Sequence, residues 1–107
     1  MANNFKNAKA DLTSTANTTI YTCPTATQSV IKSILISNDS GSSDTIDITL
    51  TDASASVFSL FKAKSVASNT TVELLEQPLI MQESEIIKAQ ATTADRLHII
   101  ISFLEVN

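Results

Sequence analysis

Several residue types that usually mark functional sites are rare in this chain of 107 residues. It has one glycine, two prolines, one cysteine, one histidine, one tyrosine and no tryptophan. A single glycine excludes a glycine-rich phosphate loop and a Gly-x-Ser-x-Gly elbow. A lone cysteine excludes an intrachain disulfide and a Cys-x-x-Cys pair. The scarcity of these residues excludes most enzyme classes that are recognised by a sequence motif.

Charge and hydropathy exclude two kinds of partner. The formal net charge is -4, and the seven basic residues are scattered, whereas nucleic-acid binding draws on clustered Lys and Arg. No apolar run approaches the roughly 20 residues of a membrane-spanning helix. The N-terminus lacks the apolar core of a signal peptide, so we expect a protein made without Sec export. We predict neither a nucleic-acid nor a membrane partner.

Cys23 and His98 are the two residues best suited to nucleophilic chemistry. A catalytic thiol needs a neighbouring base, and His98 is the only histidine available. No motif supports either residue. We therefore expect Cys23 to be a small buried hydrophobe and His98 to be a packed or hydrogen-bonded side chain. The sequence predicts no catalytic residues and no enzyme.

The acidic residues do not form a recognisable site either. The segment Asp39–Asp44 is acidic at both ends, but its spacing does not reproduce a calcium-binding loop. Paired carboxylates that cleave sugars need an aromatic-lined groove, and the chain has four Phe and one Tyr. We predict no metal site and no cofactor.

What the chain has in abundance is β-forming sequence. Serine and threonine make up about a quarter of it, and isoleucine and valine supply much of the 43% hydrophobic content. Between Asp44 and Thr51, apolar residues alternate with polar ones, as in a strand with one buried face. A chain of this length forms one domain that buries about 65% of its unfolded surface.

Eight segments have strand character, separated by polar turns at intervals of about 8 to 12 residues. This spacing predicts an all-β fold, an antiparallel β-sandwich, jelly-roll-like, with seven or eight strands. Val72–Gln77 could instead form a short helix, but Pro78 ends it, and we interpret it as strand. The predicted strands are Thr18–Thr22, Ser29–Ser37, Asp44–Thr51, Ser56–Lys62, Thr70–Leu75, Leu79–Met81, Glu85–Gln90 and Arg96–Glu105.

Two expectations concern the turns and the N-terminus. Because Gly41 is the only glycine, we expect it in the tightest hairpin with positive φ. Residues 1–16 are polar and lack alternation, so we predict an extended N-terminal arm there and a β-sandwich domain over residues 17–107.

The last predicted strand is apolar on both faces. Leu97, Ile99, Ile101 and Phe103 share one side, while Ile100 and Leu104 lie with His98 on the other. Such a strand is central or lies under a partner. We hypothesise that the arm, with Phe5 as its anchor, joins a partner by strand addition; the alternative is a frayed terminus. The predicted partner interface comprises Asn3, Asn4, Phe5, Lys6, Ile100 and Leu104.

Five segments resemble small virion structural proteins of tailed bacteriophages: Thr19–Pro24, Thr27–Ile34, Ile36–Asn38 before a Ser/Gly turn, Val72–Met81 and Leu97–Val106. The resemblance runs from about Thr18 to Val106. One departure is Gln82–Glu85, which stands where these proteins usually carry a Gly-Asp turn.

The resemblance implies a β-sandwich attached to a phage particle, assembled in the cytoplasm of the host bacterium. It implies a homo-oligomer whose partners are other virion proteins, either the major capsid protein or tail proteins. A capsid decoration (cement) protein is favoured over a tail, neck or fibre component. A carbohydrate-binding module with an aromatic patch near Tyr21, Phe58 or Phe61 stays open as a further alternative.

Overall fold

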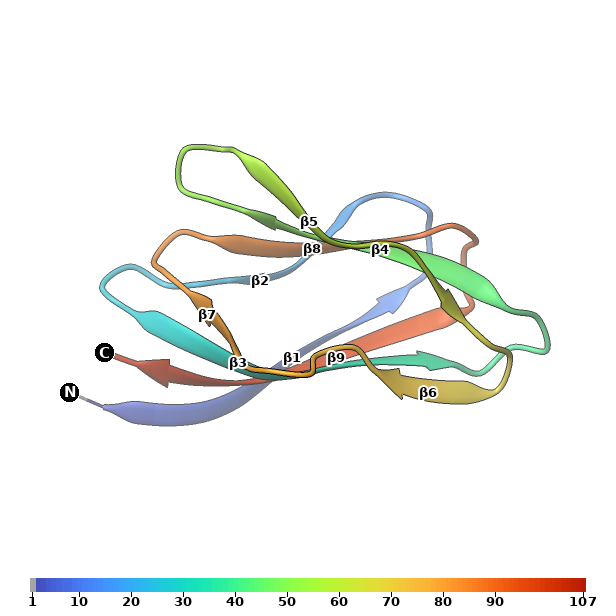
Figure 1. The fold of residues 1–107 in the computed structure, drawn as a ribbon, viewed down its shortest axis with the longest axis horizontal. Coiled ribbons are helices and arrows are strands. Elements are labelled where there is room, and N and C mark those ends of the chain that lie inside the picture. Colours follow the sequence, from blue (N-terminus) through green and yellow to red (C-terminus); the bar gives the residue numbers. More distant parts are fainter. Residues whose placement is uncertain (1) are drawn as a thin grey trace.

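The computed structural model describes residues 2–107 as a two-layered β-sandwich without helices (Figure 1). The prediction of an all-β antiparallel sandwich is confirmed. Nine strands are present in this part of the chain, and they are β1 (Asn3–Leu12), β2 (Thr18–Thr22), β3 (Gln28–Asn38), β4 (Asp44–Thr51), β5 (Val57–Val66), β6 (Thr70–Glu73), β7 (Leu79–Met81), β8 (Ile86–Ala91) and β9 (Leu97–Val106).

The strands form two sheets. Sheet A has the order β1-β9-β3-β6, with β7 also paired to β3, and sheet B has the order β2-β8-β4-β5. Only the β4–β5 and β6–β7 connections stay within one sheet; every other connection crosses between the layers. In Figure 1, sheet A is the lower layer and sheet B the upper one.

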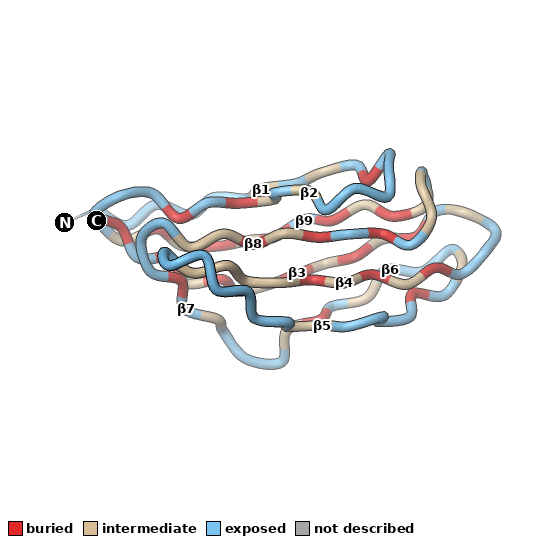
Figure 2. Tube along the Cα trace, turned by 90° about the horizontal axis from the view of Figure 1, so that it is seen from above, coloured by how far each residue is buried: buried red, intermediate tan, exposed pale blue. Residues whose placement is uncertain are grey.

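The core lies between the inner faces of the two sheets. Figure 2 shows buried and more exposed residues alternating along the strands, which is the two-residue period expected of strands with one inner face. Isoleucine dominates the core. The fully buried isoleucines are Ile31, Ile34, Ile36, Ile46, Ile48, Ile87, Ile99 and Ile101.

The predicted N-terminal arm is wrong as a separate element. Asn3–Leu12 forms β1, which pairs antiparallel with β9 along its whole length and makes one edge of sheet A. Its sequence hides this because the side that faces the core carries small residues, Ala8 and Ala10, and only Leu12 is fully buried. The strand is held mainly by main-chain pairing to a strongly apolar neighbour.

Two local expectations are also corrected. Thr70–Glu73 is a strand, as predicted, but it ends two residues earlier than expected. Gly41 is not in a hairpin: it lies in the connection from β3 to β4, between the sheets, and its φ is not positive. Positive φ is instead adopted by non-glycine residues, namely Ala26, Ala55, Ala63, Asn69, Ser84 and Asp95.

Candidate partner-binding face

The outer face of sheet A carries an apolar row that spans four strands. Phe5 on β1 pairs with Leu104 on β9, Leu104 with Val30 on β3, and Val30 with Ile80 on β7. Residues directly opposite one another in antiparallel strands project from the same face. Phe5 is 77% exposed and Ile80 is 56% exposed. The pairing register therefore aligns four large apolar side chains on one face, the outer two exposed and the middle two half-buried.

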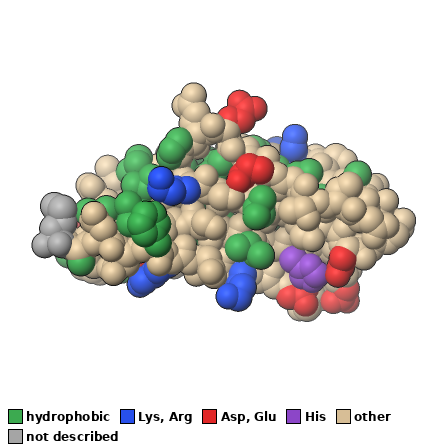
Figure 3. Space-filling model, turned by 90° about the horizontal axis from the view of Figure 1, so that it is seen from below, with side chains coloured by type: hydrophobic (Ala, Val, Ile, Leu, Met, Phe, Trp, Pro, Cys, Tyr) green, Lys and Arg blue, Asp and Glu red, His purple; other side chains and the backbone are tan. Residues whose placement is uncertain are grey.

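A second row runs parallel to the first. Ile100 on β9, which is 39% exposed, pairs with Lys9 on β1 and with Leu35 on β3. A polar row of Asn7, Ser102 and Ser33 separates the two. Figure 3 looks onto this face and shows hydrophobic side chains gathered near the end that holds the termini, with a smaller group further along. Exposed apolar surface of this kind is typical of interaction sites.

Four of the six predicted interface residues lie on this outer face. Phe5, Ile100 and Leu104 belong to the apolar rows, and Asn3 projects from the same side of β1 beside Val106. Asn4 and Lys6 alternate with them and point to the other side of the strand. Whether any of these residues contacts a partner stays a prediction.

Lys6 takes part in a polar network at the inner side of the sheet. Its Nζ lies 2.9 Å from Oε1 of Glu105, whose side chain is only 5% exposed. The hydroxyl of Tyr21 donates to Oε2 of Glu105 at 2.6 Å and lies 2.6 Å from Oγ of Ser29. The network therefore joins β2 of sheet B to β1, β3 and β9 of sheet A.

The network shifts the acidity of two of its members in opposite directions. Hydrogen bonds from Tyr21 and Lys6 lower the pKa of Glu105 below its ordinary value. Burial and the hydrogen bond to Glu105 raise the pKa of Tyr21. Both residues therefore hold fixed protonation states at neutral pH, a carboxylate and a phenol. This arrangement suits a structural tie between the layers.

Cys23 and His98 are on different sides of sheet A. Cys23 is buried in the core, where Sγ lies 3.4 Å from the carbonyl oxygen of Thr27 and 3.3 Å from Oγ of Ser29. His98 is on the outer face, where Nε2 lies 3.1 Å from Oδ1 of Asp11, its cross-strand neighbour. The structure does not bring this thiol and this imidazole together.

The acidic loop before β4 is organised by its own side chains. Oδ1 of Asn38 accepts hydrogen bonds from the amide and the hydroxyl of Ser40, and Nδ2 donates to the carbonyl oxygens of Ser42 and Val66.

Over residues 2–107, no group of three or more His, Cys, Asp or Glu side chains is placed to hold a metal ion. The same residues include no helix able to cross a membrane.

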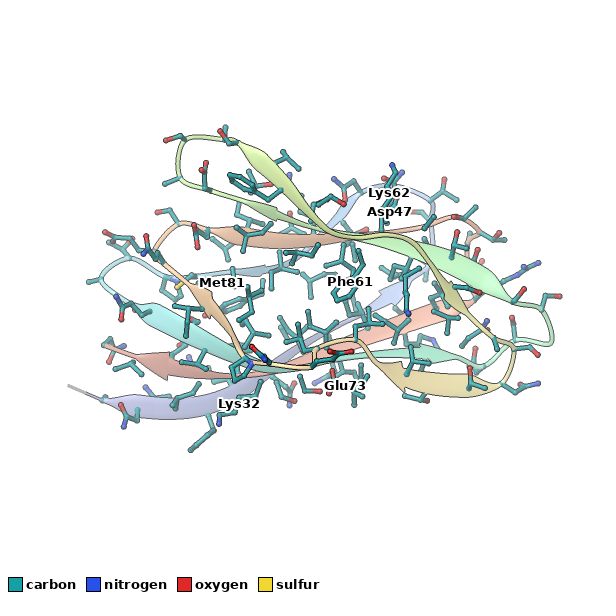
Figure 4. All side chains as sticks on the ribbon, viewed as in Figure 1. Lys32, Asp47, Phe61, Lys62, Glu73 and Met81 are labelled. Carbon is teal, nitrogen blue, oxygen red and sulfur yellow. The ribbon has the colours of Figure 1, made fainter. Side chains whose placement is uncertain are left out.

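The three aromatic residues considered for sugar binding do not form one surface. Tyr21 is 9% exposed and lies on β2, at the opposite edge of sheet B from β5. Phe61 on β5 packs against the core, and Figure 4 shows it projecting between the sheets, away from Lys62 and Asp47 on the outer side. Phe58 alone of the three is well exposed, at 53%.

Sequence reasoning missed half of the apolar face. Val30, Leu35 and Ile80 were assigned to strands but not to a surface, because the register between distant strands cannot be read from period-two alternation. A separate exposed pair, Val57 and Phe58 at the start of β5, was also missed. The only signal for that pair is two large apolar residues adjacent in sequence directly after a turn.

Comparison with protein-family models gives no match to this chain, and no curated protein matches it.

Proposed function

We propose that this chain is a virion structural protein of a tailed bacteriophage, a capsid decoration protein that docks onto the major capsid shell through the outer face of sheet A. One observation carries the docking site: the aligned row of Phe5, Leu104, Val30 and Ile80. The sequence resemblance described above supports the phage context.

The strand order supports the same proposal. If β6 and β7 are taken as one interrupted strand, each sheet has four strand positions, and most connections cross between the layers. We interpret this order as jelly-roll-like, an architecture common among viral capsid proteins. Such a protein works by binding and needs no catalytic group or cofactor, and its place is the virion, assembled in the cytoplasm of the host.

The apolar rows are suited to a binding surface in energetic terms. Removing one large apolar side chain from water contributes about 1.5–3 kcal/mol, so Phe5 and Ile80 together supply several kcal/mol. A standard interface covers about 800 Å² per partner, which is a small part of the molecule's 5812 Å² surface. The outer face of one sheet can therefore hold the capsid while the edges stay free for neighbouring copies.

Binding to purified phage heads that lack the protein tests this proposal. The full chain and two matched variants, Ile80→Ser and Val57→Ser, are added, and bound copies are counted by quantitative mass spectrometry. The two positions are similarly exposed, at 56% and 63%, but lie on different sheets. We expect Ile80→Ser to lower occupancy at least tenfold and Val57→Ser to leave it unchanged. The reverse result would place docking on sheet B.

Copy number distinguishes the tail, neck or fibre alternative. A decoration protein occupies the shell in hundreds of copies, whereas a tail or fibre component is present in a few threefold or sixfold rings. Sugar binding would instead centre on Phe58, and loss of glycan binding in Phe58→Ala, with head binding absent, would favour that module.

A further inference from the structure

Strand β1 leaves a long main-chain edge unpaired. It has ten residues and pairs with β9 without any register shift, and no described strand pairs with its other side. The other edges of the sandwich are interrupted. β2 and β5 contain register shifts, and β6 and β7 are short pieces of four and three residues. A long, regular edge is a template for pairing with another chain.

The direction of the main-chain groups on this edge follows from one terminal pair. Ala2 and Asn107 exchange both of their N–H···O=C hydrogen bonds. Because such pairs alternate along an antiparallel ladder, the even-numbered residues of β1 bond to β9. The odd-numbered residues therefore turn their N–H and C=O groups to the open side; these are Asn3, Phe5, Asn7, Lys9 and Asp11.

From this edge we infer that two copies of the chain pair through β1, antiparallel about a two-fold axis at Asn7, so that their A sheets join into one sheet. A two-fold axis perpendicular to the sheet keeps the outer faces on one side and requires odd-numbered residues to pair with odd-numbered ones. Centring on Asn7 pairs Phe5 with Lys9 and Asn3 with Asp11, and extends the contact over residues 3–11.

The strand is chemically complementary to itself in this register. No like charges stand directly opposite, because Lys9 faces Phe5 and Lys6 faces Ala8. Lys6 is also held by Glu105 of its own chain on the inner side. The contact forms about eight main-chain hydrogen bonds, since the carbonyl of Asp11 is already used by the amide of Thr13. It leaves the apolar rows exposed and unites them, and it is independent of the proposed docking.

Proline at the two-fold centre tests the pairing. The N–H of Asn7 faces the open side, so Asn7→Pro removes no main-chain hydrogen bond within one copy, and proline is tolerated at such edge positions. The exposed hydrogen bond that Lys9 Nζ donates to Oδ1 of Asn7, at 3.3 Å, is lost in Asn7→Pro and equally in Asn7→Ala. Light scattering should give the wild type a mass of twice 11.5 kDa and Asn7→Pro a mass of 11.5 kDa. Asn7→Ala keeps the N–H group and should remain a dimer. A monomeric wild type, or a dimer unaffected by Asn7→Pro, overturns the inference.

Cross-linking tests the register without a change of the main chain. In the proposed dimer the two Asn7 Cα atoms lie roughly 5.5 Å apart, whereas the two Lys9 Cα atoms are separated by four residues along the strand. Asn7→Cys should therefore be joined by a short bis-maleimide into a covalent dimer, at least tenfold faster than Lys9→Cys. Cys23 is buried and does not compete. Equal rates, or faster linkage of Lys9→Cys, exclude this pairing even if Asn7→Pro does not fold.

Discussion

Removal of the Tyr21 hydroxyl is expected to weaken the polar network that joins the two sheets and so to destabilise the protein. In Tyr21→Phe the ring keeps its contact with Phe103, whose centroid lies 4.1 Å away. The hydroxyl's two hydrogen bonds, to the carboxylate of Glu105 and to Ser29, are lost. Glu105 keeps Lys6, and Ser29 keeps the thiol of Cys23 at 3.3 Å. Neither partner is therefore left wholly unpaired.

The magnitude follows from the two lost bonds. A hydrogen bond to a charged group contributes about 1.5–3 kcal/mol and a neutral one about 0.5–1.5 kcal/mol. Because both partners retain another contact, we expect the free energy of unfolding to fall by about 2–3 kcal/mol at pH 7. For a domain of this size, 2 kcal/mol lowers Tm by roughly 8–16 °C. Urea denaturation followed by far-UV circular dichroism measures this change in unfolding free energy. Fluorescence cannot be used, because Tyr21 is the only tyrosine and the chain has no tryptophan.

The effect should also depend on pH. The pKa of Glu105 is lowered in the folded protein, so its stabilisation is present above the ordinary pKa of 4.5 and is lost as pH falls through the folded value. The hydrogen bond from Tyr21 is the main cause of that shift. The two proteins should therefore differ less at pH 3 than at pH 7. Thr22→Val, which loses an exposed hydroxyl on the same strand, should change stability by less than about 0.5 kcal/mol. A Tyr21→Phe cost that small, or one independent of pH, refutes the reasoning.

Three further outcomes are expected. Ile101→Ala should lower the free energy of unfolding in urea by about 2–5 kcal/mol, because the Ile101 side chain is fully buried. The adjacent substitution Ile100→Ala, on the outer face, should lower it by under about 1 kcal/mol. Similar values for the two variants would contradict the assignment of faces. In the folded protein, burial raises the pKa of Glu73, but hydrogen bonds from Ser33 and nearby amides lower it by more. Glu73→Gln should therefore cost about 0.5–1 kcal/mol of unfolding free energy at pH 7 and remove part of the loss of stability below pH 4.5. A cost that does not change with pH would contradict this role of the Glu73 carboxylate. Ala55→Gly should raise stability by about 0.5 kcal/mol, because Ala55 has a φ of 66°; a lower Tm in calorimetry would contradict it.

The strands that could be predicted are those whose two faces differ. β2, β4 and β7 were predicted with their observed bounds, because apolar and polar residues alternate or turns delimit them sharply. β1 was missed because its alternation is weak: polar residues alternate over Asn7–Leu12 with two alanines and one leucine, and the first half of the strand places its one large apolar residue, Phe5, on the outer side. Its existence depends on β9, which lies more than eighty residues away in the sequence.

For the candidate face, the sequence predicts which side of β9 is outward and apolar, but not which residues of the other strands lie beside it. Ile100 and Leu104 stand out because they are apolar on the side of β9 that faces away from Leu97 and Ile99. Their neighbours across the sheet are fixed only by long-range pairing, which also contains a register shift between Ile31 and Ser33. Local sequence carries no information on that shift, so Val30 and Ile80 could not be joined to Leu104 in advance.

The inner polar network and the outer apolar face depend on the same register of β1. A slip of one residue against β9 would turn Phe5 inward and Lys6 outward, since side chains alternate along a strand. Two contacts oppose the slip: the ion pair of Lys6 with the buried Glu105, and the burial of Leu12 at the other end of the strand.

Lys6→Ala should therefore weaken docking although Lys6 does not lie on the docking face. Amide hydrogen exchange should become faster in β1, at Asn4 and Ala8, while the centre of β3 stays protected. Lys9→Ala, on the outer side of the same strand and without an ion pair, is the matched control for exchange. If Lys6→Ala leaves exchange in β1 unchanged, the ion pair does not hold the register, and main-chain pairing with Leu12 burial alone positions Phe5.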